Sequence, residues 1–246
     1  MNKQQFISID LSIGSYHDIC EEIINLAQQS QSEYVCVSNV HMLVEAYKDK
    51  CFAEIVNNAI IATPDGLPLT WGLKWIYGIQ QDRVAGMDLL PNLLQQASEK
   101  NISVFFYGNT TEVLDKTKEY VREHYKGIPS VETYSPPFRE LTEKEKREII
   151  EMINASGAKL VFVSLGCPKQ EKWMASMKGK VNAIMLGIGA ALPVLIGEQS
   201  RAPQWMQKAG LEWLYRLCQE PRRLFKRYFV TNTMFIYLLI KEERHT

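Results

Sequence analysis

The chain has 246 residues, of which 46% are hydrophobic and 23% charged, and its formal net charge is zero. This composition is typical of a soluble globular protein with one large domain, or a domain and an appendage, and the neutral total argues against nucleic acid as a partner. Five cysteines, at positions 20, 36, 51, 167 and 218, form no Cys-x-x-Cys pair. A scattered, odd set argues against a disulfide framework and a zinc site and indicates reduced thiols in the cytoplasm.

The first residues, "MNKQQFISIDLSIG", lack an apolar run long enough for a signal peptide. Within them, "QQFISIDL" predicts an additional edge strand. Short β-rich runs then alternate with longer segments of helical period, and they predict strands at residues 34–38, 59–63, 103–108, 159–166 and 182–189. Strands that alternate with helices predict an α/β fold in which helices cover both faces of a parallel sheet.

Two of the intervening segments have clear helix signals. "TEVLDKTKEYVREHY", residues 111–125, brings its apolar residues onto one face. In "LTEKEKREIIEMI", Thr142 stands three residues before Glu145, which is the pattern of a capping box.

The sequence changes character after residue 197. Helix-like sequence without strands runs to the end, so we expect a core of residues 1–197 and a C-terminal helical appendage of residues 198–246. From Arg201 to Thr246, nine Lys and Arg stand against four Glu, and this excess of positive charge suggests an anionic partner. The apolar segment at residues 228–240, "YFVTNTMFIYLLI", is too short to cross a bilayer as a helix and indicates a buried or interfacial segment.

One carboxylate stands at the end of a predicted strand. In "IIATPDGLPLTWG", residues 60–72, Pro64, Gly66 and Pro68 bracket Asp65. Open α/β folds gather their ligands at the carboxyl ends of the strands, so this position suits a functional acid. Pro-Asp-Gly is also ordinary turn chemistry, and a plain turn remains the alternative.

Polar residues and glycines follow two further strands. Ser38 and Asn39 follow the strand at 34–38, where they could bind a ligand or simply start a helix. Gly187 and Gly189 lie at the end of the last strand, where a backbone without side chains can approach a ligand closely. A lone Gly-x-Gly is weak evidence by itself.

The stretch "GCPKQEKW", residues 166–173, follows a fourth strand. A proline is common at the first position of a helix, so Pro168 indicates that a helix starts here. The free backbone N–H groups at such a helix start suit an anion. Gln170 and Glu171 then fall in the first turn, where the helix dipole also favours a glutamate. A ligand site and an ordinary helix start are comparable interpretations here.

Arg83 precedes another helix-like segment in "QDRVAGMDLLPNLL". A lone arginine is usually solvated, and Asp88 in the same stretch could simply cap the helix. The sequence has no P-loop, no complete Gly-x-Gly-x-x-Gly and no Asp-x-Asp, and its histidines at 17, 41, 124 and 245 are scattered. We therefore expect neither a metal nor a cofactor, and a nucleotide diphosphate would be neutralised by Arg, Lys and backbone N–H groups.

Taken together, these segments resemble the WecG/TagA/CpsF family of bacterial glycosyltransferases. The matching stretches are "SNVHMLVEA", "TPDGLPLTWG", "DRVAGMDLL", "LGCPKQEKW", "GIGAA…GEQSRAPQWMQKAGLEWLYRL" and "EPRRLFKRY", which follow the family's order from Tyr34 to Tyr228. The resemblance implies a Rossmann-like α/β core with a C-terminal helical appendage. It also implies inverting transfer of a sugar from a nucleotide-sugar, usually a UDP-sugar, to a saccharide on a polyprenyl diphosphate lipid.

The resemblance also implies roles for particular residues. Asp65 would be the general base, and Arg83 would stabilise the leaving diphosphate. Asn39, with Ser38 beside it, and Gln170 would hold sugar hydroxyls. Ser38 stands where relatives often have Thr, a departure that keeps the hydroxyl. Family members use N-acetylmannosamine, its uronic acid or glucose, and the sequence does not decide between them.

The C-terminal segment mixes aromatic residues with cations, among them Arg216, Arg222 and Arg223. Such a mixture suits a membrane interface or the diphosphate of a lipid acceptor, and it predicts a peripheral protein on the cytoplasmic face of the membrane. A C-terminal helix packed on the core with a solvated basic face is the alternative. Homo-oligomerisation is left open.

Other classes of protein fit less well. A non-catalytic nucleotide- or lipid-binding module on the same sheet would have no need of Asp65, Arg83 and Gln170 together. The missing glycine fingerprint argues against a nicotinamide oxidoreductase. The neutral total charge and the aromatic tail argue against a nucleic-acid binder.

Overall fold

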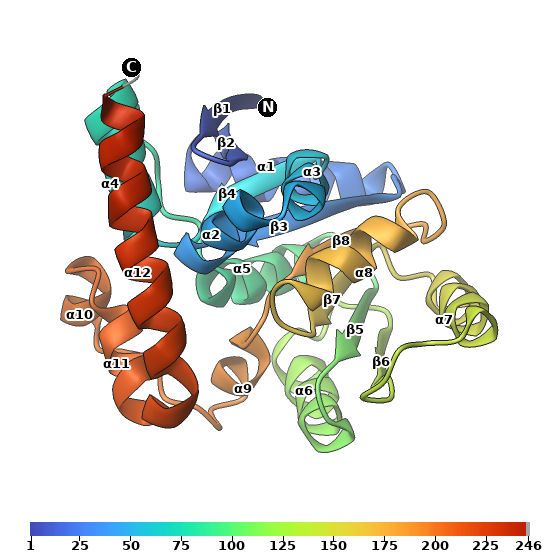
Figure 1. Cartoon of the computed structure of the whole chain (residues 1–246). Helices are drawn as coiled ribbons and strands as arrows, with labels where there is room; N and C mark the ends of the chain where they lie inside the picture. Colours follow the sequence, from blue (N-terminus) through green and yellow to red (C-terminus); the bar gives the residue numbers. More distant parts are fainter. Residues whose placement is uncertain (245–246) are drawn as a thin grey trace.

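A six-stranded, fully parallel sheet forms the centre of the computed structural model, which describes residues 1–244 (Figure 1). Residues 245 and 246, and with them His245, lie outside the described part. The strands stand in the order β4-β3-β8-β7-β5-β6. Their bounds are β3 (Glu33–Ser38), β4 (Ile61–Pro64), β5 (Val104–Gly108), β6 (Val131–Tyr134), β7 (Leu160–Ser164) and β8 (Ile184–Gly187).

The five predicted strands of this sheet are confirmed, and β6 is an addition. Strands buried on both faces have nearly continuous apolar sequences, which is why the sequence reveals β5 and β7. The edge strand β6 is four residues long, includes Glu132 and is mostly half-buried, so it has no such signal.

Helices cover both faces of the sheet, as predicted. Neighbouring residues of β3 show the two sides, because Tyr34 and Cys36 belong to one hydrophobic core and Val35 and Val37 to the other. The first core is closed by α2 (Val40–Lys48), α3 (Lys50–Asn57), α7 (Glu143–Ala155) and α8 (Lys169–Met177). The second is closed by α1 (Tyr16–Gln28), α5 (Gly86–Glu99), α6 (Thr111–His124) and α9 (Ala191–Leu195).

Local sequence signals set several of these helices. Helix α6 confirms the segment predicted at 111–125 to within one residue. The predicted capping box also forms: the Thr142 hydroxyl accepts from the backbone N–H of Glu145, and the Glu145 carboxylate accepts from the backbone N–H of Thr142. Such a box satisfies two backbone donors at the start of α7.

The N-terminal segment does not add an edge strand to the main sheet, so that prediction is wrong. Strands β1 (Asn2–Phe6) and β2 (Ile9–Ile13) pair with each other as an antiparallel hairpin. The hairpin lies beside β4, where the Ser12 hydroxyl, and not a backbone carbonyl, accepts from the backbone N–H of Ala62 at 3.0 Å. A side chain thus satisfies the edge of β4, and no ladder forms there.

Three helices end the chain, namely α10 (Gln204–Lys208), α11 (Glu212–Gln219) and α12 (Pro221–Glu243). The long helix α12 lies against α2 and α4 (Leu67–Tyr77), at the side of the sheet (Figure 1). Its buried residues include Leu224 and Phe235, and the Phe235 ring meets Phe6 of the hairpin with 6.4 Å between ring centroids. Within residues 1–244, no helix is both long enough and apolar enough to span a membrane.

Candidate active site

A cavity of about 310 Å³ opens at the carboxyl ends of β3, β4, β7 and β8. This is the edge where a doubly wound sheet binds its ligands, and the volume is in the range of small-molecule sites. Helices α10 to α12 close the cavity from the other side. Eight of the ten predicted site residues line it: Asn39, Asp65, Arg83, Gln170, Gly187, Gly189, Arg216 and Arg223.

The other two predicted residues are not on the cavity wall. Ser38 is fully buried at the end of β3, and its hydroxyl has no hydrogen-bond partner among the described residues. Arg222 is exposed on the outer side of α12.

Asp65 follows directly after β4, and its backbone is held on both sides. Its N–H donates to the Ser38 carbonyl at 2.7 Å, and its carbonyl accepts from Arg83 Nε at 2.9 Å. Helix α4 begins two residues later without a side-chain cap, with Pro68 in its first turn. The short turn therefore fixes the backbone of Asp65 at the cavity wall.

Burial is the main influence on the Asp65 carboxyl and raises its pKa to about 6. The positive charge of Arg83 opposes this shift, whereas the negative charge of Glu212 adds to it. The group therefore changes its charge close to neutral pH. A carboxylate with such a pKa is a better proton acceptor than an exposed aspartate.

Arg83 is not a solvated side chain, since only 16% of it is exposed. In addition to the bond to Asp65, its Nη2 lies 2.8 Å from Glu212 Oε2 and 3.7 Å from Asp88 Oδ2. These contacts hold the guanidinium beside Asp65. Glu212 comes from α11, so a residue of the C-terminal segment fixes a residue of the core.

Arg201 completes this ionic network. Its Nη1 lies 2.6 Å from Asp88 Oδ1, and its Nε lies 3.8 Å from Glu212 Oε1. The interpretation of Asp88 as a helix cap is wrong, because α5 begins without a side-chain cap and the carboxylate pairs with arginines instead. Apart from their place in "RAPQWMQKAGLEWLYRL", Arg201 and Glu212 have no local sequence signal that predicts these contacts.

Asn39 has two functions in the local structure. Its Oδ1 caps α2 by accepting from the backbone N–H of Met42 at 3.1 Å, as the helix-start interpretation required. The same side chain also lines the cavity. Capping therefore explains its orientation and leaves it beside the ligand space.

Gln170 ties two loops together. Its Oε1 accepts from the backbone N–H of Gly166 at 3.1 Å and of Gly189 at 3.2 Å. A Cβ at position 187 would lie 2.7 Å from Gln170 Nε2, so Gly187 is required for the packing of this amide. Pro168 stands at the cap position of α8 and Lys169 is the first helical residue, one position later than predicted.

The wall opposite the sheet is cationic. Arg216 of α11 and Arg223 and Arg227 of α12 all line the cavity. His41 of α2 lies on the same cavity, and burial, helped by Arg227, lowers its pKa. Together with Arg83, these arginines outnumber the acids on the wall, an arrangement that suits phosphate groups. The sequence places Arg227 only among the cations of the C-terminal segment, and it predicts no role for His41.

Comparisons with known proteins agree with one another. The model of the glycosyl transferase WecG/TagA/CpsF family matches residues 4–246. An N-acetylglucosaminyldiphosphoundecaprenol N-acetyl-beta-D-mannosaminyltransferase from Bacillus spizizenii is 31% identical over 217 residues. The similar region covers 88% of this chain and 82% of that relative.

Proposed function

Because the chain belongs to the WecG/TagA/CpsF family of glycosyl transferases, we propose that it transfers a sugar from a UDP-sugar to a saccharide on polyprenyl diphosphate. The similar Bacillus enzyme suggests N-acetylmannosamine as the first donor sugar to test and a lipid-linked N-acetylglucosamine as the acceptor. The uronic acid of N-acetylmannosamine and glucose are the alternatives. The product would enter a surface polysaccharide or a cell-wall polymer.

The observation that carries this proposal is one half-buried carboxylate, Asp65, beside a fixed arginine in a cationic cavity. In the proposed reaction the acceptor oxygen attacks the anomeric carbon, and Asp65 takes the proton of the attacking hydroxyl. The bond from the anomeric carbon to the diphosphate oxygen breaks at the same time. A single displacement of this kind inverts the anomeric carbon.

The leaving UDP gains negative charge as that bond breaks. Arg83 would stabilise this charge, since it is already oriented by Asp65 and Glu212. Asn39 would contact the sugar directly, with the Ser38 hydroxyl beneath it. Gln170 and Gly189 would shape the sugar-binding wall, and Gly187 makes room for the amide of Gln170.

The segment 198–246 would form the acceptor and membrane side, and α12 has two faces that fit these tasks. Arg223 and Arg227 face the cavity, where they would bind the acceptor diphosphate together with Arg216. The opposite face exposes apolar side chains with cations among them. Its members are Arg222, Phe225, Lys226, Phe229, Ile236 and Ile240. Such a face suits the anionic inner surface of the cytoplasmic membrane.

Two double variants distinguish the functions of the two faces of α12. Replacing Arg222 and Lys226 with Gln should weaken flotation with anionic vesicles and leave transfer to a short, water-soluble acceptor unchanged. A basic residue near an anionic surface contributes about 1 kcal/mol, so the partition coefficient should fall about 30-fold. Replacing Arg223 and Arg227 with Gln should instead reduce transfer even to the short acceptor.

Vesicle flotation and the two transfer assays measure these effects, with neutral vesicles and high salt as controls. Unchanged flotation of the Arg222/Lys226 variant would contradict the membrane face. Equal transfer by the Arg223/Arg227 variant and the unmodified protein would remove the acceptor role of the inner arginines.

Transfer should not depend on a divalent metal ion, because arginines supply the positive charge around the proposed diphosphate site. We expect the rate in excess chelator to stay within about a factor of two of the rate without it. Activity that disappears in chelator and returns with Mg²⁺ or Mn²⁺ would mean that the diphosphate is bound differently.

The direct test of the function is a screen of UDP-sugars with a lipid-linked N-acetylglucosamine acceptor. Product is detected by mass spectrometry, and its anomeric configuration by NMR. A β-linked product from an α-linked UDP-sugar supports the proposal. Tight binding of a UDP-sugar without turnover on any acceptor would favour the non-catalytic module instead.

A further inference from the structure

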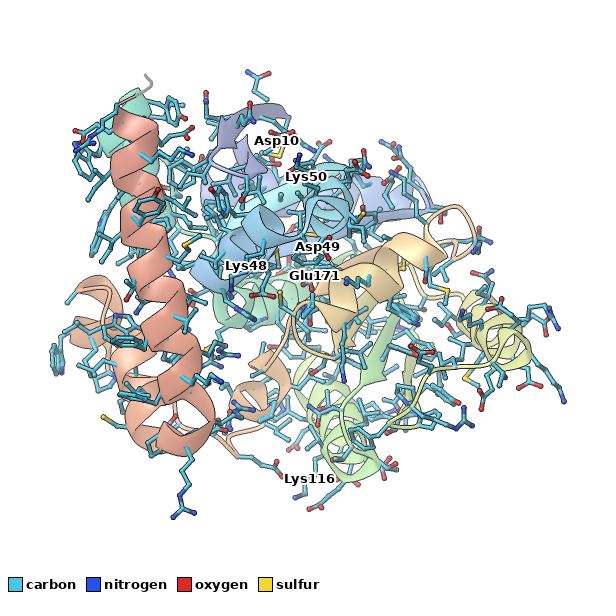
Figure 2. The ribbon with its side chains drawn as sticks, in the orientation of Figure 1. Asp10, Lys48, Asp49, Lys50, Lys116 and Glu171 are labelled. Atoms are coloured by element: carbon cyan, nitrogen blue, oxygen red, sulfur yellow. The ribbon has the colours of Figure 1, made fainter. Side chains whose placement is uncertain are left out.

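A carboxyl group outside the proposed mechanism lies fully buried beneath the cavity. Glu171 is the third residue of α8 and is 0% exposed, inside the molecule, whereas Lys116 points outward (Figure 2). Its Oε2 makes no hydrogen bond of normal geometry among the described residues, although the Cys167 thiol interacts with the carboxyl and lowers its pKa. A glutamate that only stabilises the helix dipole can remain solvated, as Glu112 does in the first turn of α6. Burial of Glu171 costs stability, so it calls for another explanation.

The other oxygen of Glu171 decides the orientation of Gln170. Oε1 of Glu171 accepts from Gln170 Nε2 at 2.7 Å. The opposite end of the amide, Gln170 Oε1, can then accept from the N–H groups of Gly166 and Gly189. If the amide turned over, its NH₂ group would face these two N–H donors and its oxygen would face the carboxyl. The contacts with the two N–H groups would be lost in either case, and the contact with the carboxyl would be lost when the carboxyl is ionised.

The bonds that this orientation permits connect two walls of the cavity. Gly166 lies in the segment after β7 and Gly189 in the segment after β8, and both have positive φ angles, +77° and +54°. Both residues line the cavity, and Gln170 is the bridge between them. The Ser164 hydroxyl also joins the two segments, because it donates to the Gly189 carbonyl at 2.6 Å. Gln170 is the contact that holds the backbone N–H groups of both glycines at once.

We propose that Glu171 is a positioning residue that locks the amide of Gln170 and so holds the Gly166 and Gly189 loops in the geometry that binds the donor sugar. The proposal rests on the proposed transferase function and extends it to a residue that does not touch substrate. Burial raises the pKa of Glu171 to about 7, and the bond from Gln170 opposes that shift. Both forms of the carboxyl can accept this bond, so the lock does not depend on ionisation.

The test uses Glu171→Met, which has a similar volume and no acceptor, and Glu171→Gln, which keeps a carbonyl acceptor. We expect Glu171→Met to lower kcat/KM for the donor about 10- to 100-fold, chiefly through KM, because the hydrogen bond that orients the Gln170 amide is lost. Its melting temperature should be unchanged or higher, since a costly buried carboxyl is removed. Glu171→Gln should stay within about threefold of the unmodified enzyme.

A double-mutant cycle shows whether Glu171 acts through Gln170. If it does, Glu171→Met added to Gln170→Leu causes little further loss, and Glu171→Leu repeats the result should the Met variant aggregate. Additive losses in the cycle would overturn the proposal. An unchanged donor KM in both Glu171→Met and Glu171→Leu would also overturn it and leave Glu171 as a packing residue. Glu112→Leu, the same kind of change in an exposed first turn, is the matched control and should have no effect on activity.

A spectroscopic measurement separates this proposal from the proposed function. The side-chain amide of Gln170 gives a ¹H–¹⁵N signal pair that Gln170→Leu assigns. We expect Glu171→Met to shift this pair and to speed its exchange with water. An unchanged pair overturns the positioning role whatever the enzyme transfers. If Glu171→Met alters the Gln170 signals but the unmodified protein transfers no sugar, the proposed function is wrong and the positioning role of Glu171 is still supported.

Discussion

Replacing Asp65 with Asn is expected to lower kcat by about two to four orders of magnitude, the usual effect of losing a general base. The amide has nearly the shape of the carboxylate, and both backbone hydrogen bonds of residue 65 remain available. The fold and the binding of UDP-sugar should therefore change little. Steady-state transfer, calorimetric UDP titration and thermal melting measure the three quantities.

The pH profile provides a second measurement of the same residue. The base must be ionised to work, so kcat/KM of the unmodified enzyme should be low in acid and rise with pH through the Asp65 pKa, at about pH 6. The residual activity of Asp65→Asn should not show this rise with pH. Asp82→Asn, the same change outside the cavity wall, is the control. Turnover within a few-fold of the unmodified enzyme would exclude Asp65 as the base.

Arg83→Gln is expected to lower kcat/KM by about two to three orders of magnitude, as removal of one fixed transition-state donor does elsewhere. Loss of the guanidinium removes the charge beside the leaving diphosphate and also leaves Glu212 without its closest cation. Because the charge of UDP grows in the transition state, kcat should fall more than donor affinity. Transfer kinetics and direct UDP binding separate the two contributions.

Arg83→Lys should recover only part of the activity, since an ammonium group cannot contact Asp65 and Glu212 with the same fork. Arg122→Gln, on the exposed last turn of α6, is the control for a lost surface charge. An Arg83→Gln variant with a normal kcat and only a higher donor KM would assign Arg83 to ground-state binding.

Much of the fold follows from the sequence because its signals are local. The apolar runs of β5 and β7 and the Thr142–Glu145 capping box each lie within a few residues. The position of Asp65 at a strand end is equally local, since Pro64 ends β4 and Gly66 caps α4. The predictions that were wrong concerned residues whose partners lie far away in the sequence. The hairpin of β1 and β2 required knowing that Ser12 satisfies the edge of β4.

The composition of the cavity depended on tertiary structure for the same reason. Arg83 and Glu212 are separated by 129 residues, and their pairing exists only because α11 packs over the carboxyl ends of the strands. The role of Gln170 likewise required the approach of two loops to one amide. Local propensity and hydrophobic period determine which segments are strands and helices. Ionic contacts, burial and the resulting pKa of Asp65 arise only when distant segments exclude water from the same space.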